Sequence, residues 1–346
     1  MNSLCTSLGR KALFSLEPED AHAFTLATLN TLYATGISRL VFPQPKVQAV
    51  QLMGLTFPNR IGLAAGADKN GECINGFGAL GFGFLELGGV TPRPQPGNDK
   101  PRVFRLPQVN GLINRLGFNN HGVQALVQNL SRFRSSGGYQ GVIGVNLGKN
   151  KDTPNEKALD DYRLCYEQLY SFIDFATINV SSPNTQGLRA LQETEELRII
   201  LSGMKAAQAR LADQHGKYVP LSVKIAPDLT ELQLEAIAQL AIAERIDAIT
   251  ATNTTTGRET VADLLYGQES GGLSGAPLFS RSNQIIRNLA KLLDGALPII
   301  GVGGVMSGAD AKLKLDCGAS LVQFYTGLIY RGPQLVTESI KSCSSM

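Results

Sequence analysis

The side chains of this chain best suited to chemistry are lysines and asparagines that lie within short apolar runs or just after them. They are Lys69, Asn146, Asn179, Asn184, Lys224 and Asn253. Such a set suits an anionic ligand with amide and carbonyl edges, because lysine supplies positive charge and asparagine both donates and accepts hydrogen bonds. No His–Asp pair or carboxylate pair accompanies them, which argues against hydrolysis by a triad or a glycosidase mechanism. A strand lysine can form a Schiff base, so a lyase using Lys224 is the main alternative chemistry.

Two glycine-containing segments near the C-terminus are typical of a phosphate site. Residues 301–304 (GVGG) follow one apolar run, and residues 325–327 (YTG) follow the next. Small residues let backbone N–H groups approach a phosphate closely. Parallel barrels frequently bind phosphate after strands seven and eight, so the pair favours a phosphorylated ligand.

Eight short runs rich in β-branched residues must position these side chains. They alternate with helix-like segments such as 230–243 and 282–293, which predicts parallel βαβ units and favours a closed α/β (β/α)8 TIM barrel over a doubly wound sheet. The runs are Ile61–Ala65, Phe84–Gly88, Val142–Leu147, Ala176–Val180, Leu221–Ala226, Asp247–Thr252, Ile299–Val302 and Leu321–Tyr325. The proline-rich segment Thr91–Asn120 interrupts the alternation, and we expect it to form part of the site.

The N-terminal stretch predicts two short helices outside the barrel. Apolar residues recur at helical spacing in both, and Pro18 and Gly36 suit the start and the end of the second helix. The apolar residues are Leu4, Leu8, Ala12 and Leu16 in the first helix and Phe24, Leu26, Leu29, Leu32 and Tyr33 in the second. Periodicity alone leaves two interpretations open, a helical hairpin packed on the barrel or an interfacial membrane segment.

Length and composition limit the remaining possibilities. The 346 residues accommodate one barrel of roughly 250 residues plus an extension. A net charge of +3 gives no case for nucleic-acid binding. The five cysteines form no CxxC pair and the three histidines lack ligand spacing, so we expect no metal site and a reducing compartment. No apolar run reaches the roughly 20 residues of a transmembrane helix, and no signal peptide is visible, which predicts a protein kept in the cytoplasm.

The motifs of the chain, taken together, resemble those of the dihydroorotate dehydrogenases. The blocks run in order from about Val47 to Pro333, and residues 18–29 (PEDAHAFTLATL) resemble the membrane-associated helices of the quinone-reducing class 2 enzymes. The blocks are GLAAGADKNGE, TPRPQPGNDKPRVFRL, GLINRLGFNN, GVNLGKNKDT, NVSSPNTQGLR, VKIAPDL, TNTT, GGLSG, PIIGVGG and GASLVQFYTG. The resemblance implies a catalytic barrel at residues 47–346 and a membrane-associated helical extension at residues 1–46.

The resemblance also implies a role for each site residue, with FMN as the cofactor. Ser182 is expected to be the catalytic base that takes the C5 proton of dihydroorotate while hydride leaves C6 for the flavin. FMN is expected to contact Ala64, Ala65, Gly66, Ala67, Asp68, Gly89, Asn146, Asn179, Lys224, Thr252, Gly275, Gly304, Tyr325 and Thr326. The substrate is expected to contact Lys69, Asn114, Arg115, Leu116, Gly117, Phe118, Asn179, Asn184, Asn253 and Thr254.

Ser182 discriminates between the classes of the family, since the soluble class 1 enzymes carry cysteine at the base position. The serine implies class 2, which oxidises (S)-dihydroorotate to orotate in UMP biosynthesis and passes electrons to ubiquinone or menaquinone. The quinone is expected to enter between Leu8–Tyr33 and the barrel, on a protein held peripherally at the cytoplasmic face of the inner membrane. The alternatives are the Schiff-base lyase, a soluble class 1 dehydrogenase, and a non-catalytic membrane-attached binding protein.

Two positions depart from the pattern of the family. Gly89 stands where the relatives usually have the threonine of GTVTP, so one hydroxyl contact to FMN is absent, unless a water replaces it. Thr326 stands where serine is more usual, and it keeps the hydroxyl. Neither departure changes the assignment.

Overall fold

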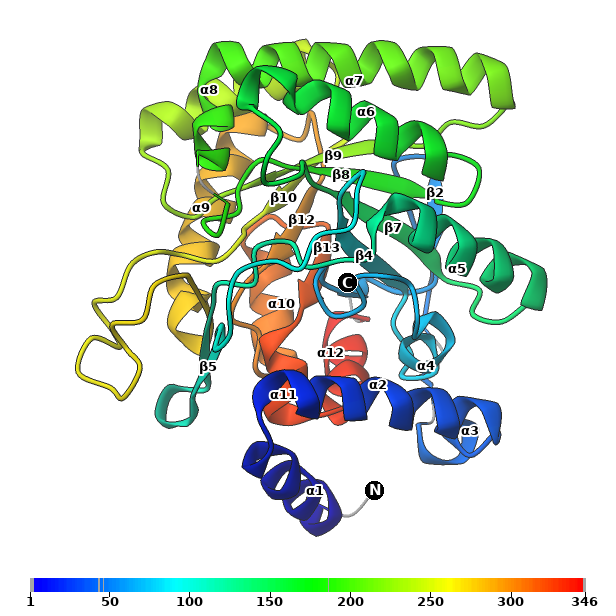
Figure 1. Cartoon of the computed structure of the whole chain (residues 1–346), viewed down its shortest axis with the longest axis vertical. Helices are drawn as coiled ribbons and strands as arrows, with labels where there is room; N and C mark the ends of the chain where they lie inside the picture. Colours follow the sequence, from blue (N-terminus) through cyan, green and yellow to red (C-terminus); the bar gives the residue numbers. More distant parts are fainter. Residues whose placement is uncertain (1–2, 43, 46, 186, 345–346) are drawn as a thin grey trace.

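A closed parallel barrel of eight strands forms the body of the protein (Figure 1). This computed structural model describes residues 3–42, 44–45, 47–185 and 187–344, without the side chains of residues 3–8. The strands, in barrel order, are β10 (Ala248–Ala251), β12 (Ile299–Val302), β13 (Leu321–Phe324), β3 (Ile61–Leu63), β4 (Phe84–Val90), β7 (Val142–Leu147), β8 (Phe175–Asn179) and β9 (Leu221–Ile225). The predicted barrel is confirmed, and the ends of its strands differ from the predicted runs by at most two residues.

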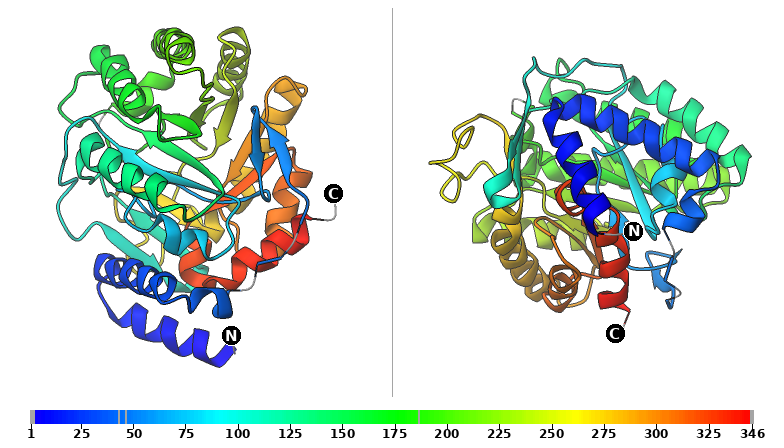
Figure 2. Two further views of the ribbon diagram at one scale, coloured as in Figure 1. Left: turned by 90° about the vertical axis from the view of Figure 1, so that its right-hand side faces the viewer. Right: turned by 90° about the horizontal axis from the view of Figure 1, so that it is seen from below.

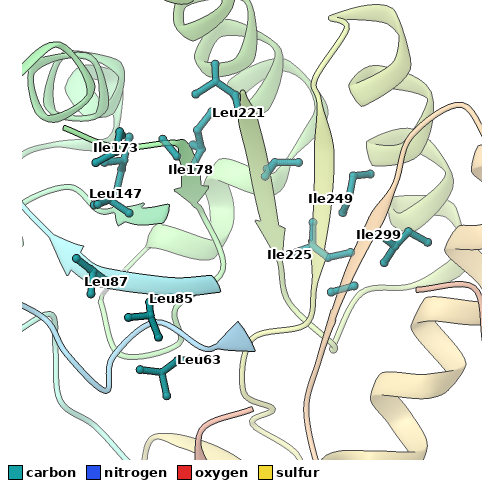
Figure 3. Packing of buried hydrophobic residues seen from close by; sticks show 14 of the residues in the cluster. Leu63, Leu85, Leu87, Leu147, Ile173, Ile178, Leu221, Ile225, Ile249 and Ile299 are labelled. Atoms are coloured by element: carbon teal, nitrogen blue, oxygen red, sulfur yellow. The ribbon is translucent and has the colours of Figure 1, made fainter. Parts of the chain in front are cut away.

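Helices cover the outside of the barrel, as the alternating pattern predicts (Figure 2, left). The amphipathic face of each helix packs its apolar residues on the strands, which stabilises the helix by tertiary contact. These helices are α4 (Ile74–Gly78), α5 (Gly122–Ser136), α6 (Ala158–Leu169), α7 (Thr194–His215), α8 (Glu231–Ala243), α9 (Phe279–Leu293), α10 (Gly308–Asp316), α11 (Thr326–Arg331) and α12 (Gln334–Cys343). Figure 3 shows leucines and isoleucines that the barrel strands contribute to this core, together with Ile173 from the loop before β8.

Phenylalanine rings fill the end of the barrel opposite the site. Phe84 packs edge-on against Phe57 with ring centroids 5.4 Å apart, and it lies 6.3 Å from Phe175. Gly62 and Gly144 face these rings, because a Cβ at either position would overlap the ring of Phe84 or Phe175. The hairpin of β1 (Val50–Leu52) and β2 (Leu55–Phe57) packs on these rings and covers this end of the barrel.

A second, antiparallel sheet of three strands lies at the carboxyl ends of the barrel strands. It consists of β5 (Val103–Leu106), β6 (Gly111–Asn114) and β11 (Gly272–Gly275). The first two strands come from the proline-rich segment 91–120, whereas β11 follows barrel strand β10 and pairs with β6 from Gly272↔Asn114 to Gly275↔Gly111. The sequence did not predict this sheet.

Three helices precede the barrel: α1 (Ser3–Ser15), α2 (Pro18–Ala34) and α3 (Ser38–Val41). Pro18 occupies the first turn of α2 and Gly36 has φ +74° just after it, so both predicted ends are confirmed; α3 was not predicted. Viewed from below, α1 and α2 meet at an angle in front of the barrel (Figure 2, right). The side chains of Leu4 and Leu8, and residue 46 at the expected domain boundary, lie outside the described part.

Polar contacts attach α1 to strand β5 of the antiparallel sheet and to α11. The Arg105 guanidinium donates to the carbonyls of Phe14 (3.3 Å) and Leu16 (2.8 Å) at the end of α1. Arg10 donates to the carbonyl of Tyr330 at 2.7 Å. Large apolar side chains remain on the outer surface, with 60% of Phe24, 85% of Leu40 and 44% of Ile37 exposed. Within the described residues, no helix combines the length and apolar character needed to cross a membrane.

Candidate active site

One cavity at the carboxyl ends of the strands collects most of the side chains that the sequence singles out. Its walls come from the carboxyl ends of all eight barrel strands, the loops that follow them, and the antiparallel sheet. Among the expected site residues it is lined by Ala64, Ala65, Gly66, Lys69, Gly89, Asn114, Leu116, Gly117, Phe118, Asn146, Asn179, Ser182, Asn184, Lys224, Thr252, Asn253, Thr254, Gly275, Gly304, Tyr325 and Thr326.

Three expected site residues do not line this cavity: Ala67, Asp68 and Arg115. Ala67 packs in the hydrophobic core. The Asp68 carboxylate is buried and accepts the backbone N–H groups of Glu72 (2.9 Å) and Cys73 (2.8 Å), while burial raises the pKa of its carboxyl to about 6. Arg115 turns outward, where it pairs with Glu269 at 2.6 Å. Asp68 therefore stabilises the turn after β3, and Arg115 stabilises the loop at the rim of the cavity.

The cavity also contains residues to which the sequence assigned no individual contact: Val103, Leu112, Ser274, Leu278, Val302, Gly303, Val305, Phe324 and Gly327. Several come from the antiparallel sheet, where β11 and β6 are far apart in the chain. Val302, Gly303 and Gly327 belong to the GVGG and YTG segments, each of which the sequence indicates as a whole. Phe324 directly precedes the expected Tyr325, so its position in the chain was the available signal.

A chain of buried amides crosses the floor of the cavity. The Glu86 carboxylate accepts from Asn146 Nδ2 at 2.7 Å and from Gln323 Nε2 at 2.6 Å. Asn179 Nδ2 donates to Asn146 Oδ1 at 2.8 Å, and Asn253 Nδ2 approaches Asn179 Oδ1 at 3.4 Å. Because each amide is oriented by the next, the network presents a defined set of polar edges. Glu86 anchors it, and its signal in the sequence is an acid within the apolar run FLELGG.

Two lysines bring positive charge to the same cavity. Among the described residues, neither the Lys224 nor the Lys69 ammonium has a hydrogen-bond partner. Burial lowers the pKa of Lys224, while the Glu86 charge acts in the opposite direction. Burial also lowers the pKa of Lys69, to about 8. Buried ammonium groups require partners, so this cavity is built to receive an anion or a strong acceptor at both positions.

Glycines with positive φ lie where a phosphate was predicted. Gly275, Gly303 and Gly304 have φ +92°, +121° and +78°. A Cβ on Gly304 would come within 2.5 Å of the Phe279 backbone, so a side chain has no room there. The Thr326 hydroxyl hydrogen-bonds Ser274 Oγ at 2.8 Å between these glycines. The result is a cradle of backbone and hydroxyl groups that can surround a small anion.

Ser182 lies in the loop after β8 and lines the cavity with only 8% of its surface exposed. Its Oγ accepts the backbone N–H of Asn184 at 3.3 Å. Asn184 Nδ2 donates to Asn114 Oδ1 at 3.1 Å, which joins this loop to strand β6. Among the described residues, the buried Oδ1 of Asn184 has no hydrogen-bond partner. Ser182 thus stands beside an acceptor that a ligand can satisfy.

The ring of Phe118 leaves no room for a side chain at position 89, where the chain has glycine. A Cβ at Gly89 would lie 2.6 Å from Phe118 Cε1, and a Cβ at Gly148 would lie 3.3 Å from the same ring. The ring therefore occupies the space above both glycines. Phe118 itself has φ +53°, an unusual value for a bulky residue, so this placement of the ring is imposed by the loop.

The N-terminal extension reaches the same region through α2. Its Glu19 pairs with the buried Arg102 at 2.8 Å, and Arg102 also donates to the carbonyls of Pro96 and Asn98 at 2.7 Å. Burial lowers the pKa of His22 to about 4, helped by the nearby Lys69 charge, so the imidazole is neutral at physiological pH. The first turns of α2 therefore form part of the surroundings of Lys69.

Comparison with known proteins agrees with the motifs. Residues 47–345 match the family model described as dihydroorotate dehydrogenase. A protein of Thiobacillus denitrificans named dihydroorotate dehydrogenase (quinone) is 56% identical over 335 residues, which cover 97% of this chain and 98% of the relative. One of Nitrosomonas europaea with the same name is 54% identical over 336 residues, 96% of each chain.

A solved structure supports the same conclusion. The crystal structure of DHODH from Eimeria tenella in complex with ferulenol superposes with a TM-score of 0.85 at 37% identity, covering 94% of this chain and 90% of that chain. The match includes the region of the N-terminal helices as well as the barrel. The chain therefore belongs to the dihydroorotate dehydrogenase family, in its quinone-dependent class 2.

Proposed function

We propose that this protein oxidises (S)-dihydroorotate to orotate, a step of pyrimidine biosynthesis, with FMN as its flavin and a membrane quinone as the final electron acceptor. The observation that carries the proposal is the cavity itself. It unites two lysines that have no hydrogen-bond partner in the described part of the chain, a network of amides, and positive-φ glycines beside the Thr326 hydroxyl. The family membership favours this reaction over a lysine Schiff-base lyase, and the relatives named as quinone enzymes favour it over a soluble class 1 dehydrogenase.

The residues present fit FMN. Gly275, Gly304 and Thr326 would hold its phosphate, because both glycines line the cavity with positive φ and Thr326 supplies a hydroxyl. The Lys224 ammonium would lie beside the ring system and supply a positive charge that favours the reduced flavin. The chemistry that FMN would supply there is acceptance of hydride from C6 of dihydroorotate and transfer of the electrons to the quinone.

The protein side chains bind the substrate and move its proton. Lys69 would pair with the substrate carboxylate, while Asn114, Asn184 and Asn253 would meet the amide and carbonyl edges. Ser182 would take the C5 proton. A serine is a weak base at neutral pH, so it needs polar groups or water to carry its own proton away.

The remaining assignment concerns the two parts of the chain. Residues 47–346 would form the catalytic barrel, and residues 1–46 would form a unit that lies on the membrane surface and guides quinone toward the flavin. The exposed Phe24, Ile37 and Leu40 support interfacial binding. A peripheral position at the cytoplasmic face of the inner membrane follows from this proposal.

The test is turnover by the purified protein. Acid-released cofactor should be FMN rather than FAD or riboflavin. Without oxygen, orotate beyond one equivalent of the bound flavin should form from dihydroorotate only when a quinone is added. A colourless protein, or one that releases orotate at the same rate without any acceptor, contradicts the proposal.

A further inference from the structure

Arg189 does not line the cavity, but its guanidinium contacts three of the loops that surround the cavity. Nε donates to the carbonyl of Ser181 at 3.1 Å, in the loop after β8. Nη1 pairs with Asp228 Oδ2 at 2.8 Å, in the loop after β9. Nη2 donates to the carbonyl of Thr254 at 2.8 Å, in the loop after β10. One side chain therefore sets the spacing of three neighbouring loops.

Two of the three contacts are made next to the site. The Ser181 carbonyl belongs to the peptide bond whose nitrogen is that of Ser182, so holding it sets the direction in which Ser182 leaves the strand. Thr254 lines the cavity, and its backbone N–H donates to Asn253 Oδ1 at 2.8 Å. The guanidinium thus fixes the proton-accepting side and an amide side of the cavity with respect to each other.

The third contact anchors the guanidinium. Asp228 also accepts the hydroxyl of Thr255 and the backbone N–H of Thr256, the latter at 3.0 Å. Burial alone would raise the pKa of the Asp228 carboxyl, but these hydrogen bonds and the Arg189 charge outweigh it and hold the pKa below its usual value. The carboxylate is therefore ionised at neutral pH and keeps the planar fork of Arg189 oriented.

The short helical turn that carries Arg189 is held independently. This turn, η3 (Leu188–Gln192), ends on Gln192, whose buried Oε1 accepts the backbone N–H of Ala226 at 2.9 Å. The backbone at Arg189 therefore has an attachment other than the guanidinium. Loss of the guanidinium is expected to loosen Ser181 and Thr254 while η3 stays in place.

We propose that Arg189 is a positioning residue for proton abstraction by Ser182. It acts through the Ser181 and Thr254 carbonyls, and it does not touch the reacting atoms. Proton transfer needs the base within hydrogen-bond reach of the proton, and misplacement by about 1 Å can slow a reaction roughly 100-fold. This inference rests on the proposed function, because it assumes that Ser182 takes the C5 proton.

The test compares Arg189→Met with Arg198→Met, an equal change at an exposed arginine of α7 whose one ion pair among the described residues is with Glu195 of its own helix. Anaerobic stopped-flow measurement gives the rate of flavin reduction by dihydroorotate, by dihydroorotate deuterated at C5, and the rate of reoxidation by a soluble quinone. Arg189→Met should slow reduction about 100-fold and increase the C5 isotope effect, with reoxidation unchanged. Arg198→Met should match the wild type in all three.

Asp228→Asn provides a second variant that keeps Arg189 and a hydrogen-bond acceptor. It should slow reduction less than Arg189→Met while raising the C5 isotope effect in the same direction. Wild-type reduction rates in both variants, or an equal loss of reduction and reoxidation without a change in isotope effect, would overturn the proposal. A wild-type protein that dihydroorotate does not reduce would remove the proposed function itself, which separates the two failures.

Discussion

Lys314 is buried behind the turn of Val302–Gly304, and its replacement by methionine should change how the free energy of unfolding depends on pH. The side chain has 0% exposure. Its ammonium donates to Ser282 Oγ at 2.8 Å and to Asn283 Oδ1 at 2.9 Å, and Ser282 Oγ in turn donates to the Val302 carbonyl at 2.6 Å. Among the described residues, no carboxylate forms an ion pair with it.

The magnitude follows from the pKa. Burial lowers the pKa of Lys314 from 10.5 to about 7. Each pH unit is worth about 1.4 kcal/mol, so a charged Lys314 costs the folded state about 5 kcal/mol below pH 7. Between pH 7 and 10.5 the unfolded chain binds the extra proton, so the free energy of unfolding rises with pH by up to about 1.4 kcal/mol per unit. From pH 6 to pH 9 this single group should add about 3 kcal/mol.

Urea unfolding of the flavin-free protein at pH 6 and pH 9 measures this contribution as a difference between variants. Tyrosines and cysteines titrate in both proteins, so their effects cancel. The stability of Lys314→Met relative to wild type should fall by about 3 kcal/mol between the two pH values. Lys312→Met, on the exposed face of the same helix, should show no such change. An equal pH dependence in wild type and Lys314→Met would refute the reasoning.

Three further predictions concern the site and the extension. Ser182→Ala should keep its flavin but be reduced by dihydroorotate at least about 100-fold more slowly in stopped flow, whereas near-normal reduction would rule out the base assignment. Removal of residues 1–46 should leave flavin reduction intact while quinone turnover and vesicle binding fall; full quinone turnover would contradict the role of the extension. Gly89→Thr should displace the Phe118 ring, lower the free energy of unfolding by about 1–3 kcal/mol and raise the KM for dihydroorotate. If both the KM and the free energy of unfolding are unchanged, the Phe118 ring does not fill the space next to residue 89.

The barrel was predictable because its signal is local. Each strand is a short β-branched run that ends in glycine or polar residues, and this pattern persists whether or not the partner strand is known. The antiparallel sheet was not predictable in this way. Strand β11 consists of GLSG and pairs with β6, far away in the chain, so neither alternation nor a hairpin turn marks it.

The sequence predicted more of the residues that line the cavity than of the residues that hold them in position. Motifs place residues in a segment, but they do not say which side of the backbone faces the cavity. Asp68 and Arg115 show the consequence, since both lie in motif blocks and yet direct their side chains to a turn and to the rim. Glu86 and Arg189 show the converse, because their importance appears only when the amides and loops that they hold are seen together.

Anaerobic titration of the flavoprotein with dihydroorotate, followed by addition of a quinone, measures both halves of the proposed reaction in one experiment. One equivalent of dihydroorotate should bleach the flavin absorbance with release of orotate, and a ubiquinone or menaquinone analogue should restore the absorbance. A flavin that stays oxidised in excess dihydroorotate, or a reduced flavin that no quinone reoxidises, would contradict the proposed function.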